Sequence, residues 1–212
     1  MSRARNTATL AASVAAFTAL AVLVATGALS EFDQWTCDHL MPLAGTPAGG
    51  PPSLLESLVP LFHATWHPVG VAVTQIVTLP GQVVISLALV AAGAWRLRAP
   101  AWVVAWFGAT ALEFALRHVL TRPALYRDGL HVGAFDSSWP SGHVLRCALV
   151  AVVLAAAWPR ARTALAAWLV VSTVLLEIAG FHTPTDVAGG LLLALVACGA
   201  AGGFRARTLR EA

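Results

Sequence analysis

The chain contains no lysine and few charged residues of any kind. Of its 212 residues, 58% are hydrophobic and 11% are charged, and the mean hydropathy is +0.75. Soluble domains carry about a quarter charged residues, so this composition argues against an ordinary soluble protein and indicates a membrane protein. We expect the lipid bilayer as its surroundings, and no nucleic acid as a partner.

Cysteine is also scarce, with Cys37, Cys147 and Cys198 as the only three, none of them in C-x-x-C spacing. Cys147 and Cys198 fall inside apolar runs, where a thiol usually behaves as a small hydrophobe. The sequence therefore indicates neither a disulfide framework nor a zinc site, and we expect no metal or other cofactor.

Long apolar runs are abundant, and each is long enough to cross a bilayer. They lie at roughly 8–29, 69–95, 100–120, 141–158, 163–181 and 185–203. Leu79-Pro80-Gly81 interrupts the second run, which we interpret as one kinked span. The first run resembles a signal peptide, but about 22 apolar residues exceed the usual h-region, which favours a retained helix. The sequence predicts an all-α, polytopic bundle of six transmembrane helices.

The arginines orient these six spans. If every span crosses, nine of the thirteen arginines lie on one side: Arg3, Arg5, Arg96, Arg98, Arg160, Arg162, Arg205, Arg207 and Arg210. The positive-inside rule assigns that side to the cytoplasm. We therefore predict a multi-pass protein of the cell membrane with both termini in the cytoplasm.

Four regions follow from this topology. They are an N-terminal transmembrane helix (1–30), an extracytoplasmic loop with an interfacial helix (31–67), a helical core (68–204) and a cytoplasmic tail (205–212). Residues 30–52 are rich in glycine, proline and threonine and are expected to form an irregular loop. The capping-box spacing of Ser53-Leu54-Leu55-Glu56 predicts the start of the interfacial helix.

Two histidine motifs open apolar runs, and the first to consider is His182-Thr183-Pro184-Thr185-Asp186. Thr183 suits the N-cap and Pro184 the first helical position. Asp186 then lies one turn from His182, where it can accept a proton from one ring nitrogen and leave the other to attack. The alternative is that Asp186 only caps the helix.

The second motif is Pro140-Ser141-Gly142-His143, in which Pro140 is expected to set the first helical turn. Ser141 and Gly142 allow backbone N–H groups to approach an oxyanion closely. His143 can protonate a leaving alkoxide. Arg146, one turn later, is expected to face a polar cavity and bind phosphate, or alternatively to extend to the outer surface.

The end of the preceding span supplies further charges. Glu113 and Arg117 have i, i+4 spacing in the favourable order, which predicts a local ion pair. Arg122 precedes Pro123, where the helix should stop. Guanidinium groups bind phosphate oxygens bidentately, so Arg117 and Arg122 are candidate phosphate ligands. Glu177 is a second membrane acid, which we expect to neutralise one of these arginines.

The order of an arginine-rich helix end, Pro-Ser-Gly-His and His-x-x-x-Asp resembles the type 2 phosphatidic acid phosphatase family, which is related to the vanadium haloperoxidases. The resemblance covers about residues 68–203. It implies an all-helical, metal-independent enzyme in which His182 attacks phosphorus to give a phosphohistidine. Asp186 would orient His182, His143 would act as the acid, and Ser141 and Gly142 would hold phosphate oxygens.

The chain departs from that family pattern at two motifs. When Arg122-Pro123 is aligned with the Arg-Pro of the first motif, Ala115 occupies the lysine position. Leu175 and Leu176 stand where the third motif has Ser-Arg. Arg146 is the candidate that compensates for these losses, together with Arg117.

Three functions remain open from the sequence. The first is a phosphatase for a membrane lipid such as phosphatidate, phosphatidylglycerol phosphate or a polyprenyl diphosphate. The second is a family member that has lost catalysis and binds lipid phosphate or a partner protein. The third is a metal-dependent enzyme or transporter, with His143, His182 and Asp186 as a two-histidine, one-carboxylate site.

Overall fold

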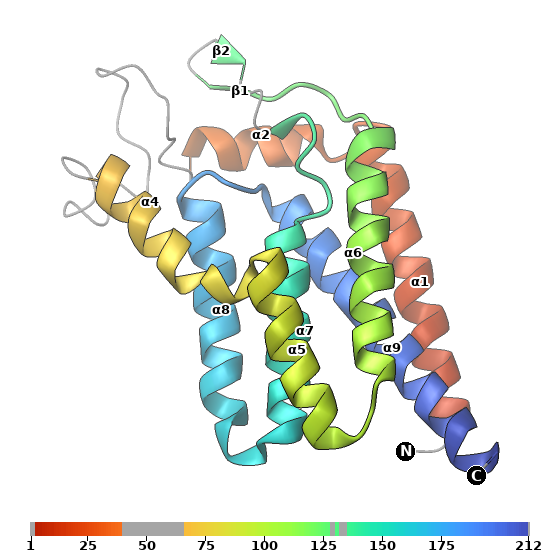
Figure 1. Ribbon diagram of the computed structural model, residues 1–212. Coiled ribbons are helices and arrows are strands. Elements are labelled where there is room, and N and C mark those ends of the chain that lie inside the picture. The colour runs from red at the N-terminus through yellow and green to blue at the C-terminus, as the bar shows by residue number, and fades with distance from the viewer. Residues whose placement is uncertain (1–2, 40–65, 128–129, 132–134, 212) are drawn as a thin grey trace.

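The computed structural model describes residues 3–39, 66–127, 130–131 and 135–211, and these form an all-helical molecule apart from one short strand pair (Figure 1). The predicted interfacial helix at Ser53 lies outside the described residues. The strand pair joins β1 (Tyr126–Arg127) and β2 (Leu130–His131) in antiparallel register. The predicted fold class is therefore confirmed at the level of helical content.

The described residues form eight α-helices. They are α1 (Arg3–Ala25), α2 (Ser30–His39), α4 (Trp66–Val77), α5 (Val83–Leu97), α6 (Ala101–Val119), α7 (Gly142–Ala157), α8 (Arg162–Ile178) and α9 (Pro184–Glu211). Two 3₁₀ turns, Leu79–Gly81 and Pro159–Ala161, precede α5 and α8.

Helix α7 occupies the centre of the bundle and packs against α5, α6, α8 and α9. Because it is surrounded, nearly every side chain from Val144 to Val153 is buried, and all of them except Arg146 are apolar, as expected for a core helix. Leu145 and Leu149 join Trp106 of α6 and Leu193 of α9 in the main hydrophobic cluster. The Pro-Ser-Gly-His motif therefore opens the most enclosed helix of the molecule.

Apolar side chains also cover much of the outer surface. Ile76, Val84, Trp95 and Val119 are each more than 70% exposed. Exposed apolar surface of this extent marks a surface that meets another apolar phase. Within the described residues, three segments are long and apolar enough to cross a membrane: Asn6–Ala25, Pro159–Ile178 and Pro184–Gly202. The structure thus indicates membrane association through three such helices.

Two predictions about irregular segments need correction. The expected kinked span at 69–95 is two separate helices, because Leu79-Pro80-Gly81 forms a 3₁₀ turn between α4 and α5, and α4 leaves the bundle at an angle (Figure 1). The expected irregular loop at 30–52 begins with ten residues of helix, α2. Gly27, at φ +75°, ends α1, and Glu31 and Asp33 then favour the N-terminus of α2.

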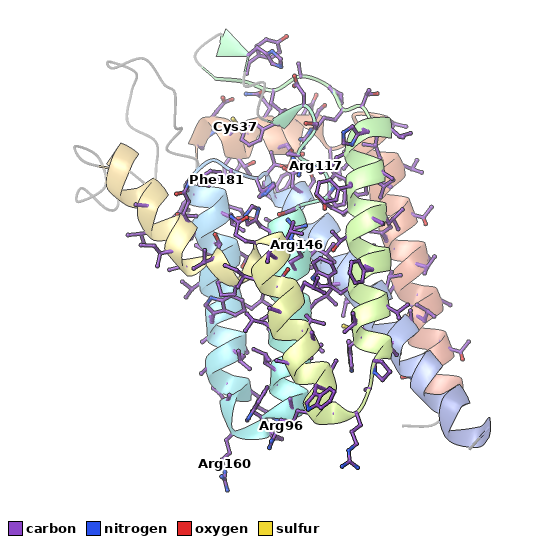
Figure 2. The ribbon with its side chains drawn as sticks, viewed as in Figure 1. Cys37, Arg96, Arg117, Arg146, Arg160 and Phe181 are labelled. Atoms are coloured by element: carbon purple, nitrogen blue, oxygen red, sulfur yellow. The ribbon has the colours of Figure 1, made fainter. Side chains whose placement is uncertain are left out.

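The bundle has two chemically different ends. Arg96 and Arg160 lie at the end where α1 begins and α9 finishes, which we call the arginine end (Figure 2). Arg117, Cys37 and Phe181 lie at the opposite end, which also carries the N-termini of α7 and α9 (Figure 2). We call this the histidine end.

Candidate functional site

The site forms where α7 and α9 begin next to each other. The Ser141 N–H donates to the backbone oxygen of Asp186 at 3.0 Å, which ties the two helix starts together. Ser141 is also the N-cap of α7, since its Oγ accepts from the Val144 N–H at 3.3 Å. The helix therefore starts at Gly142, two residues after Pro140, and not at Pro140 as the sequence suggested.

The close approach of the two helices depends on a missing side chain. A Cβ built on Gly190 of α9 would lie 2.5 Å from the Ser141 backbone oxygen and 3.1 Å from the Val144 Cβ. No real Cβ occupies such a position, so a larger residue would push the helices apart. Gly190 thus allows two distant stretches of chain to bring their histidines together.

The two histidine rings face the same small region, with centroids 6.3 Å apart and planes inclined at 51°. Nε2 of His143 lies 3.1 Å from Nε2 of Gln82, at hydrogen-bonding distance. Gln82 immediately precedes α5, so the break at Leu79-Pro80-Gly81 places this amide beside the ring. An amide N–H that donates to Nε2 leaves the ring proton on Nδ1.

His182 is buried and backed by Asp186. The Nδ1 atom of His182 lies 3.7 Å from the Asp186 Oδ2, beyond hydrogen-bonding distance, and it has no hydrogen-bond partner. Oδ2 accepts from the Ser138 hydroxyl at 2.6 Å and from the Thr183 N–H at 2.9 Å. Asp186 therefore caps the first turn of α9 and faces the histidine at the same time, which combines the two roles considered from the sequence.

Arg122 lies in a buried network and not in an open cavity. Its Nη1 donates to the Asp186 Oδ1 at 2.9 Å and to the Thr183 hydroxyl at 3.3 Å, and its Nη2 donates to the Asp33 Oδ2 at 2.7 Å. The side chain is 3% exposed. Both terminal nitrogens thus already have anionic partners, and one guanidinium serves two carboxylates.

Asp33 comes from α2 and completes this network. Its Oδ2 also accepts from the Thr185 hydroxyl at 2.6 Å, and its Oδ1 accepts from the Thr185 N–H at 3.4 Å. Burial raises the pKa of the Asp33 carboxyl, while the Thr185 hydrogen bond and the Arg122 charge oppose that rise. No sequence pattern singles out Asp33, because no motif or periodicity pairs it with a residue 89 positions away.

A second buried carboxylate, Glu113, joins the two remaining arginines. Its Oε1 accepts from Arg117 at 3.2 Å, as the i, i+4 spacing predicted, and its Oε2 accepts from Arg146 at 3.1 Å. Arg146 also donates from Nε to the Gly81 backbone oxygen at 2.7 Å. Arg117 remains 34% exposed and donates to the Ser137 backbone oxygen. Arg146 is therefore held inside the bundle, and Arg117 is the more accessible cation.

The expected partner of these arginines is not the one found. Among the residues that the structure describes, Glu177 forms no ion pair, and Glu113 neutralises both Arg117 and Arg146 instead. Glu113 lies directly against the start of α7, since a Cβ on Gly142 would be 2.5 Å from its Oε1. The carboxylate thus lies beneath the helix start where the motif was expected to hold an oxyanion.

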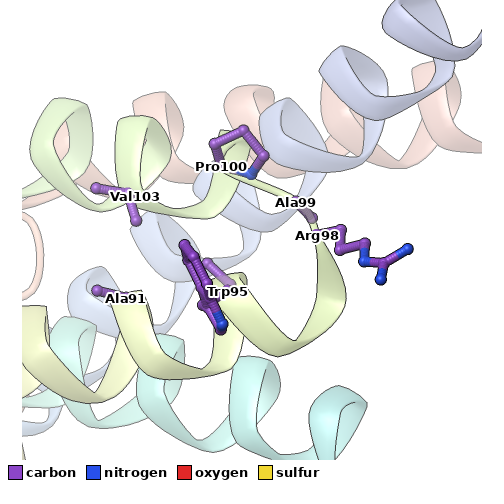
Figure 3. A pocket seen from close by; sticks show the side chains of 7 residues that line it. Ala91, Trp95, Arg98, Ala99, Pro100 and Val103 are labelled. Carbon is purple, nitrogen blue, oxygen red and sulfur yellow. The ribbon is translucent and has the colours of Figure 1, made fainter.

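In the described part of the chain, no three His, Cys, Asp or Glu side chains are grouped so as to hold a metal ion. The two-histidine, one-carboxylate alternative therefore has no support from the geometry. A cavity of about 680 Å³ opens between α5 and α6 at the arginine end, where it is lined by apolar side chains, Arg98 and Trp95 (Figure 3). No acidic or nucleophilic side chain lines it, so it provides no catalytic group.

Comparisons of the chain with protein-family models, with curated proteins and with solved structures give no match.

Proposed function

We propose that this chain is an integral membrane phosphatase that hydrolyses a phosphate monoester or diphosphate of a membrane lipid, of the kind found in the type 2 phosphatidic acid phosphatase family. The observation that carries the proposal is the meeting of two histidines, 6.3 Å apart, at two adjacent helix N-termini. One is backed by a buried carboxylate and the other by an amide. Helix N-termini favour anions, and imidazole suits both nucleophilic attack and proton transfer.

The reaction assigns one role to each ring. Nε2 of His182 attacks phosphorus, forming an N–P bond as the bond from phosphorus to the leaving oxygen breaks. His143, in its doubly protonated imidazolium form, gives one proton to that oxygen and becomes neutral, and Asp186 stabilises the positive charge of the attacking ring through Nδ1. Water then cleaves the N–P bond, with His143 as the base, to release phosphate. The 3.7 Å gap between His182 and Asp186 needs only a small ring movement to close.

The phosphate ligands follow from accessibility. Arg117 is 34% exposed at the histidine end, so we assign it to the phosphate, whereas Ser141 and Gly142 at the start of α7 are buried against Glu113. Arg122 and Arg146 are held by buried carboxylates, so in the proposed site they fix Asp186 and Glu113 in place. Arg117 is then the candidate to replace the lysine that the family's first motif would have supplied.

The membrane arrangement belongs to the same proposal. We assign six crossings, the second of them made by the two separate helices α4 and α5 in succession, and place the arginine end in the cytoplasm and the histidine end outside. Arg96 and Arg160 at one end and the acids of α2 at the other support this orientation (Figure 2). The substrate phosphate would then lie at the outer lipid–water boundary.

A second candidate function is a family member that binds lipid phosphate without turnover. The engagement of Arg122 and Arg146 by carboxylates favours it, because it leaves fewer free cations for a transition state. The two candidates predict different results in one assay.

The test is phosphate release in detergent micelles from phosphatidate, phosphatidylglycerol phosphate and polyprenyl diphosphate. His182→Ala should abolish release, while His118→Ala, an exposed histidine of α6, should not change it. Labelled substrate should give an acid-labile, alkali-stable protein label that His182→Ala lacks. Vanadate should inhibit and chelators should not. Binding of lipid phosphate with no release by the native protein would instead establish the second candidate.

A further inference from the structure

Helix α2 is linked to the proposed catalytic pair through the side chain of Asp33. Asp33 is 1% exposed and bonds two partners from distant parts of the chain, Arg122 and Thr185, at 2.7 and 2.6 Å. Arg122 in turn bonds Asp186. A chain of contacts therefore runs from α2 to the carboxylate behind His182.

We propose that Asp33 is a positioning residue for Asp186, because it occupies one side of the Arg122 guanidinium and so keeps Asp186 aligned with His182. The proposal rests on the proposed function for its catalytic consequence, but its structural part does not. Asp33 itself touches neither histidine and has no role in the reacting bonds.

The geometry of the guanidinium explains the effect. Nη2 is directed to Asp33 and Nη1 to the Asp186 Oδ1, so Asp186 is held through a single oxygen. Its other oxygen, Oδ2, stays available to Ser138, to the Thr183 N–H and to the His182 ring. Without Asp33, the guanidinium is free to turn and bind both oxygens of Asp186, which is the geometry arginine prefers with a carboxylate. That rotation would draw Oδ2 away from His182.

The charges of Asp33, Asp186 and Arg122 also favour a role for Asp33 in the proposed reaction. Two buried carboxylates share one guanidinium, so the network has surplus negative charge beside the nucleophile. In the proposed reaction, the His182 ring gains positive charge as its Nε2–P bond forms, and this surplus stabilises it. Removing the charge of Asp33 leaves Arg122 to neutralise Asp186 alone.

Asp33→Asn is the direct test, and Asp38→Asn is the matched control. Asp38 lies on the same helix but is exposed, and its only hydrogen bond among the described contacts is to Gln34, one turn away. Phosphate release should fall about 100-fold in kcat for Asp33→Asn with KM nearly unchanged, as expected when a reacting group is misplaced. Asp38→Asn should match the native protein. Equal kcat values for the two variants would overturn the proposal.

Hydrogen–deuterium exchange at residue resolution gives a readout that does not need activity. The Thr183 N–H donates to the Asp186 Oδ2 at 2.9 Å, and the hydrogen bonds found for Asp33 in the described residues go to Arg122 and Thr185, so this N–H reports the position of Asp186. Its exchange should become faster in Asp33→Asn and stay unchanged in Asp38→Asn. Native protection of the Thr183 N–H in Asp33→Asn would refute the inference.

The two measurements separate the two proposals. If the native protein releases no phosphate, or if His182→Ala still does, the proposed function fails and the exchange of Thr183 alone decides the role of Asp33. If Asp33→Asn does not fold, Thr185→Val replaces it. This variant removes the hydroxyl that bonds Asp33 at 2.6 Å and contacts the Thr183 hydroxyl at 3.2 Å, and it leaves all charges in place. Thr185→Val should lower both kcat and the exchange protection of the Thr183 N–H, by less than is expected for Asp33→Asn. No change in either quantity would reject the inference.

Discussion

Gly142→Ala should destabilise the protein, although alanine is normally the better helix residue. A Cβ at this position would lie 2.5 Å from Oε1 and 2.6 Å from Cδ of Glu113, and 2.9 Å from Nη1 of Arg146. The carboxylate is fully buried and paired with Arg117 and Arg146, so it cannot move aside without breaking an ion pair. Crowding against Glu113 therefore outweighs the gain in helix propensity, and the substitution lowers the stability of the protein.

The magnitude follows from two opposing contributions. Replacing glycine by alanine in a helix contributes at most about 0.5–1 kcal/mol of stability. Overpacking a filled site costs about 1–3 kcal/mol. With mid-range values for both contributions, the net loss is about 1 kcal/mol in the free energy of unfolding, which lowers the Tm of a chain of this size by about 2–4 °C.

Gly108→Ala is the matched control, because Gly108 lies within α6 and a Cβ there has no atom within 4 Å. It should raise the Tm by about 1–4 °C, since only the propensity gain remains. Thermal unfolding of both variants in the same detergent provides the measurement. Equal increases in Tm for the two variants would show that Glu113 does not lie against the start of α7.

Three further perturbations test other parts of the site. Glu113→Gln should lower the free energy of unfolding, measured by thermal unfolding, by about 3–5 kcal/mol, because it leaves the buried charge of Arg146 without a counter-ion. The double variant with Arg146→Met should recover part of that loss. Gln82→Leu should lower kcat for phosphate release by about tenfold or more, because His143 loses the amide that orients its ring, whereas an unchanged kcat would exclude that role. The raised pKa of Asp33 means that the folded protein binds its proton more tightly than the unfolded chain does. The stability of the native protein relative to Asp33→Asn should therefore increase as the pH falls through that pKa, and a decrease on acidification would show that Arg122 outweighs burial.

The sequence correctly indicated the features that depend on neighbours along the chain. The helical content followed from long apolar runs, and the start of α9 at Pro184 followed from the preference of proline for the first turn. The pair between Glu113 and Arg117 followed from their spacing of one helical turn. The break at Leu79-Pro80-Gly81 was located correctly, but its extent was underestimated.

The packing of distant segments decided the rest. Asp33 meets Arg122 across 89 residues, Gln82 meets His143 across 61, and Arg146 meets Glu113 across 33. No periodicity in the sequence relates these positions. The sequence therefore predicts Arg122 and Arg146 as phosphate ligands, whereas in the structure both are paired with buried carboxylates.

The sequence alone determined that each of the two histidines would lie at the beginning of a helix. The signals for a helix start are an N-cap residue and an early proline ahead of an apolar run, and these residues act within a single helical turn. Only the tertiary structure decided that the N-termini of α7 and α9 are adjacent, and which buried charges form ion pairs with each other. The reason is physical: helix formation depends on local backbone hydrogen bonds, whereas the pairing of buried charges depends on which helices come within a few ångströms of each other.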